Sequence, residues 1–137
     1  MSHIITGEPV ARFVSDQLGF GLCPPYTALG IATDEGDIIA GVIFNNFEGA
    51  DVHITVAGKG WTRAFMRAVG DYVFGQLQCE RMTITTEQPA VAMLGTRLGG
   101  QIEGRLRNHF GPGKDGLVVG VLKDEYRWYR PNVPALL

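Results

Sequence analysis

The chain has 137 residues, of which 45% are hydrophobic and 19% charged, and its formal net charge is −2. This length suits one domain, since single cores run to about 100–150 residues, and the composition excludes a largely disordered, collagen-like or coiled-coil chain. The net charge is slightly negative, whereas a dedicated nucleic-acid binder usually has a large positive charge. A local basic patch is still compatible with this net charge. We therefore expect a single domain over residues 1–137.

Targeting and redox signals are weak. No basic segment followed by a long apolar run opens the chain, and no stretch approaches the length of apolar sequence that spans a membrane. The two cysteines, Cys23 and Cys79, are too few to suggest a disulfide framework, so we expect both to be reduced. These observations predict a cytoplasmic protein that makes no membrane contact.

The first half of the chain predicts a helix followed by three strands. Apolar residues recur at helical spacing over 8–18, and a Gly- and Pro-rich segment ends that helix. Runs typical of strands follow at 26–33, 38–44 and 51–57, with turn residues between them. Short turns of this kind favour an antiparallel meander.

The second half predicts strand-helix-strand crossovers and a closing hairpin. One apolar face runs along a helix over 61–73, and a strand at 81–86 then lies parallel to the preceding one. Pro89 starts another helix that Gly99 and Gly100 end, and strands at 101–108 and 116–123 pair antiparallel. The predicted class is α/β (α+β), with a mixed, mostly antiparallel six- to seven-stranded sheet and helices on both faces.

A glycine-rich turn joins the third strand to the next helix and reads Gly58-Lys59-Gly60-Trp61-Thr62. Such a turn exposes backbone N–H groups at a helix N-terminus, where the helix dipole favours an anion such as a pyrophosphate. A plain strand-to-helix turn is the alternative, because glycine is the default turn residue.

With this order of elements, Ala57-Gly58-Lys59-Gly60-Trp61-Thr62 resembles the acetyl-CoA loop of the GNAT superfamily, whose pattern is (Arg or Gln)-x-x-Gly-x-(Gly or Ala). Gly60 matches it strictly, whereas Ala57 and Thr62 depart from it. The resemblance covers residues 26–128. It points to the branch that includes the acetyltransferases of ribosomal-protein alanine termini and many short phage and prophage proteins.

A second block, residues 88–107, is similar to the family's Asn-x-x-Ala-x-x-Leu-Tyr-x-x-x-Gly-Phe motif and the Glu-Gly and basic strand after it. The matching residues are Leu94, Leu98, Gly99, Glu103, Gly104 and Arg105. Gln88 stands in place of a cofactor-contacting Asn, and Gly100 in place of the Phe. Gly95 replaces the Tyr that often protonates the departing thiolate, so the usual general acid is missing.

The resemblance implies a GNAT-like acyltransferase fold that transfers acetyl from acetyl-CoA to a primary amine by direct attack, with coenzyme A as the cofactor. It assigns the pantetheine arm to the backbone of the third strand and the pyrophosphate to the turn that follows. The implied cofactor-binding residues are Ile54, Val56, Gly58, Lys59, Gly60, Trp61, Thr62, Arg63 and Gln88. The sequence has no Cys-x-x-Cys pair and no histidines at metal-ligand spacing, so we expect no metal site.

A base that deprotonates the acceptor is expected on or beside the third strand. His53 is the only histidine in that strand, and an unperturbed pKa near 6.5 suits proton acceptance at neutral pH. Strand alternation places Asp51, His53 and Thr55 on one face. We name His53 and, more weakly, Asp51 as catalytic candidates; the alternative for His53 is a sheet histidine bonded to a neighbour or to solvent.

The acceptor is expected to be a small-molecule amine or a protein N-terminal amine, and a homodimer is an open alternative. A non-catalytic CoA-binding or interaction module is the second hypothesis, because Gly95 and the loose loop motif fit a loss of chemistry. A third, by similarity to phage acyltransferase-like proteins, is a nucleic-acid substrate, against which the acidic charge weighs.

Overall fold

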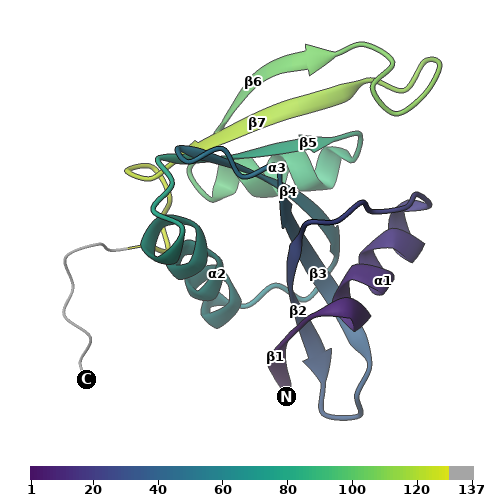
Figure 1. The fold of residues 1–137 in the computed structure, drawn as a ribbon, viewed down its shortest axis with the longest axis vertical. Helices are drawn as coiled ribbons and strands as arrows, with labels where there is room; N and C mark the ends of the chain where they lie inside the picture. Colours follow the sequence, from purple (N-terminus) through teal and green to yellow (C-terminus); the bar gives the residue numbers. More distant parts are fainter. Residues whose placement is uncertain (130–137) are drawn as a thin grey trace.

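A computed structural model describes residues 1–129, and residues 130–137 lie outside the described part. Seven strands form one mixed sheet in the order β1-β2-β3-β4-β5-β7-β6 (Figure 1). The strands are β1 (Ser2–Thr6), β2 (Thr27–Thr33), β3 (Ile38–Asn45), β4 (Asp51–Gly58), β5 (Arg81–Thr86), β6 (Gln101–Leu106) and β7 (Gly116–Leu122). This sheet confirms the predicted fold class.

Helices cover both faces of the sheet. On one face α1 (Glu8–Leu18) packs against β3 and β4. On the other lie α2 (Arg63–Gly70), its continuation as a π-helical turn η1 (Asp71–Gln76), and α3 (Pro89–Arg97). No helix among residues 1–129 is long and apolar enough to cross a membrane.

Helix α1 lies unusually close to the sheet. Val10 and Val14 of α1 point toward the sheet and are fully buried. A Cβ added to Gly41 of β3 would approach a methyl group of each valine to 2.8 Å. Glycine at this position therefore allows the close packing that anchors the segment leading from α1 to β2.

The elements depart from the sequence expectations in three places. The strand β1 was not predicted, because its five residues are almost all exposed and form a sheet edge that pairs with β2 alone. The helix after β4 begins at Arg63 instead of residue 61, because Thr62 is its N-cap, and it keeps α-helical geometry only to Gly70 before it widens into η1. The strand β6 ends at Leu106 instead of residue 108.

The feature that matters most for function is a gap between β4 and β5. These two strands pair in parallel from Asp51↔Arg81 to Ile54↔Ile84, where the pairing stops. Beyond that point β4 continues to Gly58 paired with β3, and β5 continues to Thr86 paired with β7. The sheet therefore splits where both strands approach the N-termini of their following helices.

Candidate active site

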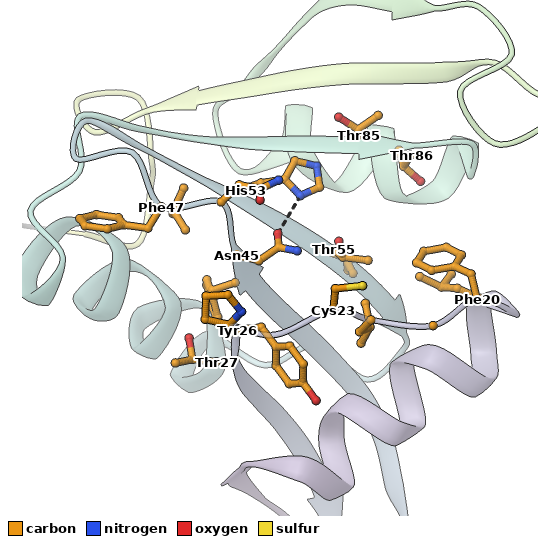
Figure 2. A pocket seen from close by; sticks show the side chains of 18 of the residues that line it. Phe20, Cys23, Tyr26, Thr27, Asn45, Phe47, His53, Thr55, Thr85 and Thr86 are labelled. Atoms are coloured by element: carbon orange, nitrogen blue, oxygen red, sulfur yellow. Dashed lines mark hydrogen bonds between the residues drawn. The ribbon is translucent and has the colours of Figure 1, made fainter.

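A cleft of about 1370 Å³ opens at this split. Its walls are formed by the connection between α1 and β2, the end of β3 and the turn after it, the diverging ends of β4 and β5, residues of η1 and its C-terminal end, and the loop between β6 and β7. Phe20 of the first connection stacks on Phe110 of the last, with ring centroids 6.5 Å apart. The cleft thus has one wall of backbone and short polar side chains and another that is aromatic (Figure 2).

His53 lines this cleft from β4. Its Nδ1 lies 3.2 Å from Oδ1 of Asn45, the residue that faces it across the β3–β4 ladder (Figure 2). An amide oxygen only accepts hydrogen bonds, so this contact holds the ring proton on Nδ1. The lone pair of His53 is then on Nε2, available to accept a proton.

The electrostatic surroundings of His53 keep it neutral. Burial lowers its pKa from the usual 6.5, the neighbouring Asp51 opposes this with its negative charge, and His109 adds a small lowering effect. A pKa below 6.5 means that the unprotonated ring dominates at neutral pH. This is the protonation state that a general base requires.

Asp51 shares a face with His53 but does not line the cleft. Thr83 donates its hydroxyl to the two carboxylate oxygens of Asp51 at 2.9 and 3.1 Å, and Arg81 Nε lies 3.7 Å away. Arg81 is in turn paired with Glu103 at 2.6 Å. The Asp51 carboxylate is therefore hydrogen-bonded and ion-paired to its neighbours. It affects the cleft through its negative charge, which acts on His53.

The glycine-rich turn presents backbone amides at the N-terminus of α2. Gly58 and Gly60 have φ of 98° and 89°, values that favour glycine, and the Lys59 amide donates to Ile39 at 3.0 Å. Within the described chain, the amides of residues 60–64 have no hydrogen-bond acceptor. They are free for an anion.

The side chains of this turn have distinct structural roles. Thr62 is the N-cap of α2 and accepts a hydrogen bond from the Phe65 amide at 3.1 Å. Trp61 packs against Phe65, and the Arg63 guanidinium lies 5.9 Å from the centre of the Trp128 ring. Thr62 and Trp61 therefore shape the turn, whereas exposed Arg63 adds positive charge beside the free amides.

The remaining cofactor candidates lie along the gap. Ile54 forms the last parallel pair with β5, and Val56 lies two residues further along β4, where one edge of the strand no longer has a sheet partner. Gln88 is the N-cap residue of α3 and lines the cleft, and its side chain makes no capping bond. The split therefore brings Val56, Gln88 and His53 to a common cleft, whereas Ile54 and residues 58–63 are not among its lining residues.

Gly95 has no room for a larger residue. It lies on the buried face of α3, and a Cβ built there would be 2.8 Å from Val119 Cγ1 and 3.3 Å from Ile84 Cδ1. The structure thus explains the missing tyrosine: α3 packs too tightly on β5 and β7 to hold one.

Gly95→Tyr is therefore expected to destabilise the protein instead of restoring a general acid. Overpacking of a filled core costs about 1–3 kcal/mol or more, so the free energy of unfolding in urea should fall by at least that amount. Gly95→Ala, which adds only the Cβ, should show a smaller loss. An unchanged denaturation midpoint for the tyrosine variant would contradict the packing described here.

Two groups in the cleft were missed from the sequence. Asn45 was assigned to a turn, although its register opposite His53 follows from pairing the two predicted strands. Phe20 and Phe110 lie in separate loops, and no spacing pattern links residues 90 positions apart in loops whose paths the sequence leaves open.

Comparison with solved structures places the fold in a known class. Mutant forms of the spermidine/spermine N-acetyltransferase SpeG from Vibrio cholerae match with a TM-score of 0.69 and 16% identity, over 92% of this chain and 97% of that chain. The spermidine N-acetyltransferase from Vibrio cholerae in complex with CoA and spermine gives a TM-score of 0.70 at 15% identity, over 91% and 97% of the two chains. A dodecameric structure of that enzyme in an intermediate state gives 0.70 at 15%, over 92% and 96%.

No protein-family model matches the chain, and neither does any curated protein. The protein therefore has the acyl-CoA acyltransferase fold of the GNAT N-acetyltransferases. At 15–16% sequence identity, this similarity establishes a shared fold alone.

Proposed function

We propose that this protein is an acyl-CoA-dependent N-acyltransferase that transfers acetyl from acetyl-CoA to a primary amine. The observation that carries the proposal is the end of β4–β5 pairing at Ile54 and Ile84, beside a neutral His53 and the free amides of the turn before α2. The neighbours of the same fold are N-acetyltransferases, and one of them is in complex with CoA, which supports the same reaction class here.

The residues present fit coenzyme A. A gap bounded by strand backbone suits the extended, amide-containing pantetheine arm, because beyond Ile54 the N–H and C=O groups on the edge of β4 that faces β5 have no sheet partner. The amides of Gly60 to Arg63 and the α2 dipole suit the pyrophosphate. Lys59 and Arg63, both exposed, add positive charge there.

In this proposal acetyl-CoA supplies the activated acetyl group, and the chain contributes orientation, carbonyl polarisation and a proton acceptor. Nε2 of His53 takes a proton from the ammonium of the acceptor, while Asn45 holds the ring in the required tautomer. The free amine then attacks the thioester carbonyl carbon directly, without an acyl-enzyme: the N–C bond forms, the C–S bond breaks, CoA leaves as its thiolate, and the remaining extra proton on nitrogen passes to the thiolate or to water. Asp51 acts through its charge, which opposes the effect of burial on the His53 pKa.

Acetyl-CoA is expected to stabilise the folded protein. A ligand that binds only the native state adds RT ln(1 + [L]/Kd), about 2.7 kcal/mol at a hundredfold excess over Kd. Thermal denaturation with and without the cofactor measures this effect. An unchanged melting temperature at millimolar acetyl-CoA would contradict the proposal.

A non-catalytic CoA-binding module is the second candidate function. The tight packing around Gly95 favours it, because no tyrosine can supply the usual proton to the departing thiolate there. Both candidates predict CoA binding, and only the enzyme predicts CoA release in the presence of an amine.

Finer assignments remain part of the proposal. Resemblance to the ribosomal-protein-alanine and phage-type branch rests on the sequence motifs, and a protein N-terminal amine or a nucleic-acid acceptor rests on the same resemblance. Two free thiols, Cys23 and Cys79, agree with the proposed cytoplasmic location, where cysteines stay reduced.

A further inference from the structure

The acceptor side of the cleft is predominantly aromatic. Side chains from four separate segments line it: Phe20 and Tyr26 before β2, Phe47 after β3, Tyr72 of η1, and Phe110 between β6 and β7. Phe20 and Phe47 are 41% and 54% exposed, although rings of this size normally bury most of their surface. Phe20, whose ring stacks on Phe110, offers an exposed apolar surface to a flat ligand.

The cleft offers very little negative charge. Glu87, directly after β5, is the only carboxylate among its described lining residues. Asp51, whose negative charge acts on His53, is already engaged by Thr83 and Arg81. The other titratable side chains among the described lining residues are His53, His109, Cys23, Tyr26 and Tyr72, none of which is a carboxylate.

This charge distribution discriminates between amines. A polyamine carries several ammonium groups, and each one taken out of water must be paired with an anionic or hydrogen-bonding partner. One carboxylate can pair with one ammonium, and the remaining charges of a polyamine would find no second carboxylate among the described lining residues, only aromatic rings and uncharged amide and hydroxyl groups. An amine with a single ammonium and an apolar body leaves no charge unpaired.

Resting on the proposed function, we infer that the acceptor is a monoamine with an aromatic body. Its ammonium approaches His53 and Glu87, and its ring packs on the Phe20–Phe110 pair. Binding of such a ring buries apolar area on both partners, worth about tenfold or more in affinity over the same amine without the ring. The preference for an aromatic amine then comes from two loops, the α1–β2 connection that carries Phe20 and the β6–β7 loop that carries Phe110.

The test is calorimetric titration of three amines into the protein saturated with CoA: phenethylamine, ethylamine and spermidine. Phenethylamine and ethylamine share the ammonium and differ by the ring, whereas spermidine supplies the extra charges. We expect phenethylamine to bind at least about tenfold more tightly than either of the others. Phe20→Ala should remove most of that advantage, while Ile102→Ala, an exposed apolar residue of β6 outside the cleft, should leave it unchanged.

Equal or tighter binding of spermidine, equal binding of ethylamine, or no amine binding to CoA-loaded protein would each overturn the inference. Failure to bind CoA at all would instead contradict the proposed function, and the amine series on the CoA-free protein would still test the acceptor preference. Circular dichroism of the Phe20 variant checks that it folds, and Phe110→Ala tests the same pair from the opposite loop.

Discussion

Replacing Gly60 with aspartate is expected to remove most of the stabilisation that CoA gives the protein. Gly60 lies in the turn whose amides have no acceptor within the described chain, just before Thr62 caps α2. A carboxylate there competes for the same amides and repels a bound pyrophosphate. Two unit charges about 6 Å apart interact by roughly 1–3 kcal/mol for an effective dielectric between that of water and about 20, so the Kd for CoA should rise tenfold or more.

The matched control is Gly60→Ala. Gly60 has a φ of 89°, and a Cβ there would lie 2.8 Å from Ile39 Cδ1, so both variants have the same backbone strain and the same contact. Only the aspartate adds charge. The alanine variant should therefore lose intrinsic stability and keep the larger part of the CoA-induced rise in melting temperature. Equal CoA affinity in the two variants would place the pyrophosphate elsewhere.

His53→Gln is expected to lower kcat by about 10²–10⁴-fold, the usual contribution of general base catalysis, with little change in CoA affinity. Glutamine can still hydrogen-bond Asn45 across the strands but cannot accept the proton of an ammonium. The CoA contacts assigned here come from the β4 backbone and the turn before α2, which the substitution does not touch. Turnover is measured as CoA release with an accepted amine, and CoA affinity by calorimetry.

The pH dependence gives the same residue a second, independent readout. Protonated His53 cannot act as a base, so activity should be lost as pH falls through its pKa, which burial has lowered below 6.5. The wild-type rate should therefore be level near neutral pH and fall on the acid side. The glutamine variant should lack this acid limb.

Two outcomes would contradict the role of His53. Unchanged turnover in the glutamine variant would exclude it as the base, and an acid limb that persists in that variant would belong to another group. Asn45→Ala should have a smaller effect on kcat than His53→Gln, because it removes the contact that sets the tautomer and leaves the imidazole in place.

The sequence predicted the parts of the fold that depend on local periodicity. The bounds of α1 and β5 agree with the predicted ones, because buried positions in each recur at the helical or strand period. The strand β1 was missed since its stability comes from pairing with β2 at the sheet edge, a contact between segments distant in sequence. The parallel β4–β5 pair followed from the helix between the strands, but the point where pairing ends did not.

The candidate site was predictable to a smaller extent. Strand alternation placed His53 and Asp51 on one face correctly, yet only the structure places Asp51 against Arg81 and Thr83 and outside the cleft. Thr62 departs from the motif, and its hydroxyl caps α2. Such assignments depend on the orientation of individual side chains.

The most direct test of the central claim is a structure of the protein with acetyl-CoA. We predict the pantetheine arm in the gap between β4 beyond Ile54 and the end of β5, with the pyrophosphate on the amides of Gly60 to Arg63 and the thioester facing the cleft lined by His53. Acetyl-CoA bound on any other surface, or a gap without ligand at saturating acetyl-CoA, would contradict the account.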